Sequence, residues 1–323
     1  MKTKLIYDDI CSTLKGSLDI EVKSSVQIHR GWMNLKWIVE TNKGKLFIKQ
    51  FNKTRFSTNK MMMIKERLKI HDLLSKNGVL CPQIIAYKGD LVIKSEQGEE
   101  FIITDAKEGS VLDYGKINEN QIRHLGECIG QMHFVLNEKL NETPNEMVGP
   151  GWQLGSREDL LKEWQEIYDN HNDCSNPEVK HQLMRQKEIF ESMDLDEFAD
   201  CRKGWSHSDL WSHNIHFTDD KVSGLLDFDR VQYSYPETDI ARALLSLALN
   251  EGEMDSHLVD EFINGYSKYY SITRNDIRRA IKLMWCEESF WWIREPAFNC
   301  SSPPERKLKE MIWIMDQWEV LMK

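Results

Sequence analysis

The alternation of apolar and polar residues near the start of the chain predicts a β-hairpin followed by a helix. Residues 36–40 and 45–51 alternate in this way, and the turn Thr41–Gly44 joins them. Over residues 59–76 the apolar residues change to helical spacing. Four residues at steps of four, four and three share one predicted face of that helix: Met62, Glu66, Ile70 and Leu73. A carboxylate on such an apolar face is costly unless it is paired.

After residue 106 the pattern is mostly helical. The predicted helices lie at about residues 122–136, 156–170, 177–193 and 240–249. The prolines and glycines of residues 139–155 predict a loop, and a short hairpin is expected over residues 215–226. We therefore expect an α+β chain with a strand-rich, one-helix N-terminal lobe over residues 1–105 and a mostly helical lobe over residues 106–323.

Composition limits the class of protein. The chain has 323 residues, enough for two lobes with their own cores, and no apolar run approaches the length of a membrane span. Its formal net charge of −10 opposes a nucleic-acid partner, which would need a basic face. The first nine residues lack the apolar core of a signal peptide, and the 7 cysteines are scattered without a C-x-x-C pair. These features predict a cytoplasmic protein with free thiols and no membrane partner, of undefined oligomeric state.

The most informative chemistry lies between residues 207 and 229. Asp209 is followed by Asn214 after five positions (214 − 209) and by Asp227 after eighteen (227 − 209). A phosphoryl-transfer site needs these groups in this order: a carboxylate that orients the acceptor hydroxyl, then an amide and a carboxylate that bind Mg²⁺. The predicted hairpin would fold the chain so that the three groups meet. A zinc site is the alternative, but no cysteine pair or H-E-x-x-H helix accompanies its candidate ligands, which are His207, Asp209, His213 and His216.

This pattern resembles the aminoglycoside phosphotransferase / choline kinase / homoserine kinase superfamily of small-molecule kinases. The resemblance rests on H-x-D-x-x-x-x-N at His207–Asn214, on the Asp-Phe-Asp of residues 227–229 and on Asp239 further along, and it runs from about Ile28 to Tyr266. The homoserine-kinase-like branch, which also holds spore-coat kinase-like proteins, is the most similar. The resemblance implies a bilobal protein-kinase-like fold, ATP and Mg²⁺ as cofactors and a small-molecule substrate.

Two residues depart from the common pattern. Ser208 stands where glycine or arginine is common between the His and the Asp, and its small side chain should preserve the tight loop. Asp229 stands where protein kinases have the glycine of D-F-G, which argues against an activation-loop switch. Asp239 is expected to cap the following helix and to brace the catalytic loop, and His133 to be a hydrogen-bonded core histidine.

The resemblance assigns roles to individual residues. Asp209 would be the catalytic base, and Asn214 and Asp227 would bind Mg²⁺. Lys49, on the return strand of the first hairpin, would bind the α- and β-phosphates while Glu66 holds it in place.

The remaining nucleotide contacts are less specific. Gly31 and Asn34 would form the phosphate loop, although a plain β-turn explains that stretch equally well. Thr104 and Ala106 would offer backbone groups to adenine at the end of an apolar strand, and an ordinary edge strand remains the alternative.

Substrate contacts are expected in the C-terminal helices and beside the catalytic base. An aromatic and acidic face could enclose a carbon skeleton and meet an ammonium group, with Trp211, Glu287, Glu288 and Trp291 as candidates. Packing of the tryptophans with solvated glutamates is the alternative.

The function expected from these residues is ATP- and Mg²⁺-dependent phosphorylation of a hydroxyl on a small molecule. The acceptor could be an aminoglycoside, an amino alcohol, a homoserine-like compound or a sugar, and the choice between ATP and GTP is open. The alternative is a spore-coat-type structural protein with a kinase-like fold and little or no catalysis. Because every metal- and phosphate-binding position is filled, catalysis is favoured.

Overall fold

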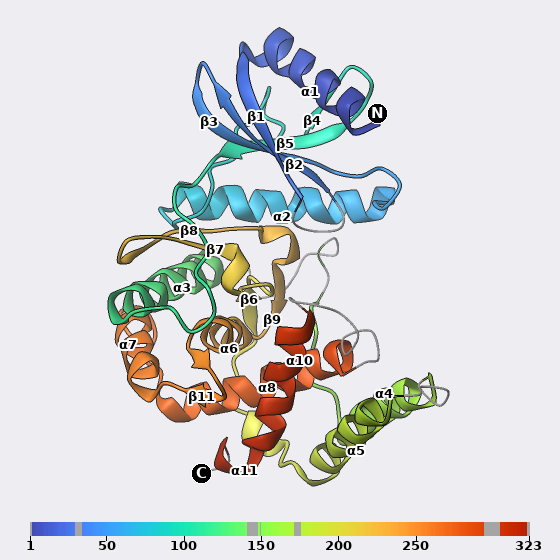
Figure 1. Cartoon of the computed structure of the whole chain (residues 1–323), viewed down its shortest axis with the longest axis vertical. Helices are drawn as coiled ribbons and strands as arrows, with labels where there is room; N and C mark the ends of the chain where they lie inside the picture. The colour runs from blue at the N-terminus through green and yellow to red at the C-terminus, as the bar shows by residue number, and fades with distance from the viewer. Residues whose placement is uncertain are drawn as a thin grey trace. The chain divides into compact units, whose positions relative to one another are not determined.

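The computed structural model describes residues 2–29, 34–140, 148, 150–170, 176–293 and 304–321 (Figure 1). The chain forms two compact units: unit 1 is Met1–Val111, Pro144–Gly149 and His213–Val231, and unit 2 is Leu112–Thr143, Pro150–Ser212 and Gln232–Lys323. Unit 1 thus includes the hairpin of residues 215–226, which a division after residue 105 would place in the C-terminal part. No helix in the described ranges is long and apolar enough to cross a membrane.

Unit 1 is built on a five-stranded antiparallel sheet in the order β1-β2-β3-β5-β4. Its strands are β1 (Val22–Ile28), β2 (Leu35–Thr41), β3 (Gly44–Gln50), β4 (Ile93–Lys94) and β5 (Glu100–Asp105). The predicted hairpin is confirmed as β2 and β3. Its register places Lys49 opposite Lys36 on one side and Ile102 on the other. Lys49 therefore lies on a central strand, where hydrogen bonds on both sides hold its backbone.

Unit 1 has two helices before residue 105, although the sequence pattern predicted one. The unexpected helix is α1 (Lys2–Leu18), whose Ile6, Ile10 and Leu14 recur at steps of four. Ile10 and Leu14 are fully buried against one face of the sheet, in a core with Val39 and Ile48. Asp8 lies on the solvent side, whereas Asp9 is buried and accepts a hydrogen bond from the Ser95 hydroxyl.

The predicted second helix is confirmed as α2 (Thr58–Lys76), but its buried face differs from the expected one. Ser57 caps its first turn by accepting a hydrogen bond from the Lys60 amide. The buried residues are Met61, Ile64, Leu68, Ile70, His71 and Leu74, whereas Met62 is 42% exposed. Because methionines stand at consecutive positions, two different faces of the helix look apolar in the sequence. The face that is buried in the structure includes Met61 and does not include Glu66.

Unit 2 is mostly helical, as expected, and with unit 1 it confirms the α+β class. Its helices are α3 (Glu119–Lys139), α4 (Arg157–Asn170), α5 (Pro177–Ser192), α6 (Pro236–Leu247), α7 (Ser256–Tyr266), α8 (Arg274–Trp292), α10 (Pro304–Asp316) and α11 (Trp318–Leu321). Two short strands, β6 (Gly204–Ser206) and β9 (Gln232–Ser234), pair antiparallel beside them. The predicted helices at 122–136, 156–170, 177–193 and 240–249 correspond to α3, α4, α5 and α6.

Helices α3 and α7 pack against each other through glycines. A Cβ on Gly265 of α7 would overlap the carbonyl oxygen of Arg123, and a Cβ on Gly126 of α3 would overlap that of Phe262. The two backbones can approach this closely because neither glycine carries a side chain. This contact sets the position of two residues that matter below, His133 on α3 and Tyr266 on α7.

Gly265→Ala is expected to lower the free energy of unfolding by about 1–3 kcal/mol, the usual cost of an overpacked contact. Urea denaturation followed by circular dichroism measures the change. Gly16→Ala on α1 is the control, since a Cβ there meets no heavy atom within 4 Å. The control should be neutral or stabilising by up to about 1 kcal/mol. Equal effects of the two substitutions would contradict the close packing of α3 on α7.

Candidate active site

Lys49 is a buried cation held by two carboxylates. Its residue is 4% exposed, and its Nζ lies 2.9 Å from Oδ1 of Asp227 and 2.5 Å from Oδ2 of Asp229. Burial lowers the pKa of Lys49 while the two carboxylates raise it, and the net shift is upward. Lys49 therefore stays charged at neutral pH, as a phosphate-binding lysine must.

The hairpin β7 (Ile215–Thr218) and β8 (Lys221–Leu225) brings the two predicted Mg²⁺ ligands next to each other in unit 1. Asn214 precedes β7 and Asp227 follows β8. The Leu226 amide donates a hydrogen bond to the Asn214 carbonyl oxygen at 2.8 Å, which closes the hairpin at its base. Lys36 adds a further positive charge, with Nζ 3.7 Å from Oδ2 of Asp227.

The predicted ion pair between Lys49 and Glu66 is wrong for this structure. Glu66 lies 2.6 Å from Nζ of Lys69, one turn further along α2, and Lys49 pairs with Asp227 and Asp229. The reason is the register of α2, whose buried face excludes Glu66. The neighbouring Arg67 connects α2 to the site instead, because its Nη1 donates to the backbone oxygen of Asp229 at 2.8 Å.

Asp229 is the functional residue that sequence reasoning missed in unit 1. Burial raises the pKa of Asp229 above its ordinary value, Lys49 lowers it and Asp227 raises it further, with a net upward shift. Two carboxylates beside one ammonium group explain this, since each disfavours the charge of the other. The signal in the sequence is the second Asp of Asp227-Phe228-Asp229, which the comparison with the D-F-G of protein kinases interprets only as the loss of a glycine.

The predicted nucleotide contacts are partly described by the structure. Gly31 lies outside the described residues. Asn34 has a buried Oδ1 that accepts no hydrogen bond from the described part of the chain. The Ala106 amide donates to the Lys45 carbonyl at 3.1 Å, and a contact of Ala106 with adenine would therefore use its carbonyl oxygen. Thr104 is buried on β5, opposite Phe47.

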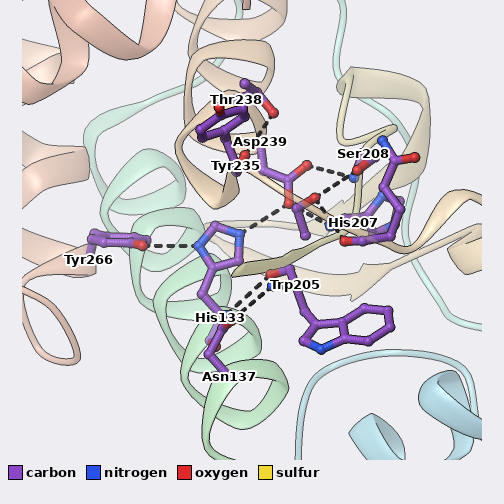
Figure 2. A network of polar contacts seen from close by, with 11 residues as sticks. His133, Asn137, Trp205, His207, Ser208, Tyr235, Thr238, Asp239 and Tyr266 are labelled. Atoms are coloured by element: carbon purple, nitrogen blue, oxygen red, sulfur yellow. Dashed lines mark hydrogen bonds and ion pairs between the residues drawn. The ribbon is translucent and has the colours of Figure 1, made fainter. Parts of the chain in front are cut away.

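In unit 2 the Asp239 carboxylate holds the loop that carries Asp209 (Figure 2). Its Oδ2 accepts the His207 amide at 2.6 Å, and its Oδ1 accepts the Ser208 amide at 2.8 Å. The predicted bracing role of Asp239 is thus confirmed. The predicted capping role is wrong, because Tyr235 occupies the N-cap position of α6 and both Asp239 oxygens face the loop.

A relay of hydrogen bonds extends from Asp239 to α7. His133, 1% exposed, places Nε2 at 3.1 Å from Oδ2 of Asp239 and Nδ1 at 2.9 Å from the Tyr266 hydroxyl. A neutral imidazole satisfies both contacts, with Nε2–H donating to the carboxylate and Nδ1 accepting from Tyr266. The interpretation of His133 as a hydrogen-bonded core histidine is therefore confirmed. Asn137 adds a second brace by accepting the Trp205 amide at 2.8 Å.

The loop geometry at Asp209 also depends on Ser208. Its φ of 59° is left-handed, a region that residues other than glycine rarely occupy. Asp227 has a φ of 63° and shares this property. Backbone strain of this kind gathers at functional sites, where the surrounding hydrogen bonds hold it in place.

The predicted substrate residues separate into different environments. Glu288 forms an ion pair with the buried Arg242, with 2.7 Å between its Oε2 and Nη1 of the arginine. Trp291 is 65% exposed, whereas the adjacent Trp292 is partly buried.

Trp211 and Trp292 both face the ammonium group of Lys307, each with 4.8 Å between Nζ and the ring centroid. Glu287 is partly buried on α8. Sequence reasoning missed Trp292 and Lys307.

The predicted Mg²⁺ site consists of one amide and one carboxylate side chain, those of Asn214 and Asp227. Within the described residues, no group of three or more His, Cys, Asp or Glu side chains is arranged to hold a metal ion. An Asn–Asp pair completed by phosphate oxygens and water differs from such a cluster and suits Mg²⁺, which retains waters and takes few protein ligands.

Asp239→Asn is expected to lower the free energy of unfolding by about 2–3 kcal/mol, because an amide nitrogen would face buried donors. Hydrogen exchange of the His207 and Ser208 amides should accelerate in parallel, which mass spectrometry can follow. The matched control is Asp276→Asn at the exposed start of α8, where Asp276 accepts from the Thr273 amide at 2.8 Å. That change should cost less than about 1 kcal/mol. Unchanged exchange in Asp239→Asn would rule out the bracing role.

Comparison with solved structures shows a protein-kinase-like phosphotransferase fold. Amicoumacin kinase hAmiN, solved in complex with AMP-PNP, Ca²⁺ and Ami, is 16% identical with a TM-score of 0.63, over 98% of this chain and 96% of that one. Wild-type aminoglycoside 2′-phosphotransferase-IIIa, a GDP complex, is 14% identical with a TM-score of 0.64, over 99% of each chain. Spectinomycin phosphotransferase, with ADP and spectinomycin, is 14% identical with a TM-score of 0.55, over 98% and 97%. At these identities the likeness concerns the fold alone.

Family assignment comes from sequence. No curated protein matches the chain significantly. The family model described as "Phosphotransferase enzyme family" matches residues 25–280, which contain Lys49, Asp209, Asn214, Asp227 and Asp239. This match spans most of the 323 residues, and the chain therefore belongs to the phosphotransferase enzyme family.

Proposed function

We propose that this protein transfers the γ-phosphoryl group of ATP, with Mg²⁺, to a hydroxyl group of a small molecule. The observation that carries the proposal is the buried Lys49 between Asp227 and Asp229, together with the hydrogen bond that joins Asn214 to Leu226, the residue before Asp227. A cation for phosphate and oxygen ligands for a divalent metal are the two requirements of nucleotide phosphate binding. Family membership supports the reaction class.

Unit 1 would bind the nucleotide phosphates. Asp227 and Asn214 would hold Mg²⁺, and their carboxylate and amide oxygens suit this ion. The bound metal would neutralise charge on the β- and γ-phosphates. Lys49 would contact the α- and β-phosphates from its rigid position on β3, and Asp229 would keep Lys49 oriented while Asp227 engages the metal.

Unit 2 would supply the base. Asp209 would orient the acceptor hydroxyl and take its proton as the new O–P bond forms and the bond from the γ-phosphorus to the ADP oxygen breaks. Its loop is held by the Asp239 hydrogen bonds, so the carboxylate needs little reorganisation during the reaction. Positioning and charge neutralisation should provide most of the rate gain.

The acceptor and the nucleotide are part of the proposal. Solved proteins of this fold include an amicoumacin kinase with AMP-PNP and Ami, a spectinomycin phosphotransferase with ADP and spectinomycin, and an aminoglycoside 2′-phosphotransferase with GDP. We propose ATP for this chain. We also propose a cytoplasmic location, with which the five free cysteines among the described residues agree. The structural, coat-type alternative has no support, because the chain carries Asp209, Asn214, Asp227 and Lys49.

Two substitutions separate metal binding from proton transfer. Asp209→Asn should keep the rise in melting temperature that Mg·ATP causes but reduce turnover by about 10²–10⁴-fold, the range for a general base. Asp227→Asn should lose that rise, because the metal loses its carboxylate ligand. Differential scanning fluorimetry and a coupled ADP-release assay with kanamycin, homoserine, choline and sugars give both readouts. Asp220→Asn, in the exposed turn of the same hairpin, is the control. Full turnover in Asp209→Asn would refute the assigned base.

Lys49 pairs with Asp227 and Asp229 and not with Glu66, and kinetics of variants can test this difference. Glu66→Gln should change the KM for ATP less than about 2-fold, since an exposed helix ion pair contributes little. Lys49→Met should raise that KM about 10- to 100-fold through loss of a charge-assisted contact. Steady-state kinetics at saturating acceptor measure both values. A large effect of Glu66→Gln would instead indicate that Glu66 replaces Asp227 as the partner of Lys49 when nucleotide binds.

A further inference from the structure

Lys307 on α10 is a buried cation without a carboxylate partner among the described residues. It is 8% exposed, and its ammonium group is enclosed by the rings of Trp211 and Trp292, with 4.8 Å from Nζ to each centroid. Two indole faces offset part of the desolvation of an ammonium group, but they accept no strong hydrogen bond from its three N–H groups. A buried charge in this state is costly.

The nearby carboxylates are already neutralised by arginines. Glu288 pairs with Arg242 through Oε2 and Nη1 at 2.7 Å. Glu310 pairs with Arg242 as well, and with Arg306 through Oε1 and Nε at 2.9 Å. The two glutamates and two arginines balance each other, so neither glutamate is left to pair with Lys307, and the remaining negative charge that acts on it is that of Asp209.

The same region lies close to the proposed base. Trp211 follows Asp209 by two positions, and the Trp211 amide donates to the Asp209 carbonyl oxygen at 3.1 Å. Burial lowers the pKa of Lys307, and the fields of Glu288 and Asp209 offset this only in part. A ligand that brings its own negative charge to Lys307 would relieve this cost and would lie beside Asp209.

We propose that Lys307, between Trp211 and Trp292, binds a carboxylate group of the acceptor, so that the substrate is a hydroxy acid rather than a polyamine. This inference rests on the proposed function and names its substrate class. The carboxylate would take the N–H groups of Lys307, and the indole rings would cover the adjoining carbon atoms. The hydroxyl of the same molecule would then face Asp209, whereas the carboxylate itself remains unchanged by the reaction. A cationic group at this position would be repelled by the Lys307 ammonium group.

Matched acceptor pairs test the charge requirement. The pairs are D-gluconate with D-glucitol and D-glycerate with glycerol, and kanamycin is the cationic comparison. For at least one pair, kcat/KM of the acid should exceed that of its neutral partner by about 10- to 100-fold, as expected for a charge-assisted hydrogen bond. Preference for the neutral partner or for kanamycin, or no turnover of any acid, overturns the inference.

Variants of Lys307 assign the effect to this side chain. Lys307→Met and the polar Lys307→Gln should each raise the KM for the acid about 10-fold or more, leave the KM for ATP unchanged and remove the preference over the neutral partner. Lys307→Arg should restore part of the preference. Lys309→Met is the matched control, since Lys309 on the same helix pairs with Glu305 in solvent at 2.6 Å. If the acid preference survives in a folded Lys307→Gln protein, Lys307 has no such role.

The two levels of proposal fail in different ways. Kanamycin phosphorylation without acid phosphorylation would reject the hydroxy-acid inference and keep the phosphotransferase assignment. Absence of both Mg·ATP stabilisation and turnover of every acceptor would reject the proposed function itself.

Discussion

The Asp239 carboxylate is the group on which the arrangement of the catalytic loop depends. A charge that is 1% exposed is stable only when donors surround it, and here two loop amides and the His133 imidazole serve as donors. These donors belong to separate parts of unit 2, so satisfying one side chain aligns α3, α6 and the loop at once. Tyr266 continues the chain of contacts to α7, whose distance from α3 is set by glycines. Helix packing and loop geometry are therefore parts of one constraint.

Buried cations in the described part of the chain pair with carboxylates, and Lys307 is the exception. Lys49 is held by Asp227 and Asp229, Arg242 by Glu288 and Glu310, and Lys282 by Glu197. For these three cations, desolvation is compensated within the protein. Lys307 has aromatic rings in place of carboxylates. The contrast distinguishes charges that hold the fold from a charge that has no carboxylate partner among the described residues.

Local patterns explain which features could be predicted from the sequence. The order Asp209, Asn214, Asp227 and the hairpin between the last two depend on short-range spacing, and the structure contains that hairpin. The Glu66 prediction failed because Met61, Met62 and Met63 allow two helix registers, and only packing against the sheet selects one. The partnership of Asp229 with Lys49 joins residues 180 positions apart, and Lys307 meets Trp211, which lies in a distant segment of the chain. Such pairings arise from tertiary structure and leave no periodic signal.

The left-handed backbone at Ser208 and Asp227 has a consequence for natural variation in this family. At position 208 the constraint is conformational, so glycine or asparagine would relieve it, whereas valine, isoleucine and threonine would be excluded by their branched Cβ. At position 227 the same relief is forbidden, because the proposed metal ligand must keep its carboxylate. Relatives should therefore vary at the first position among residues without a branched Cβ, while they keep aspartate and its conformational cost at the second. A permissive position and an intolerant one can thus arise from the same dihedral angle.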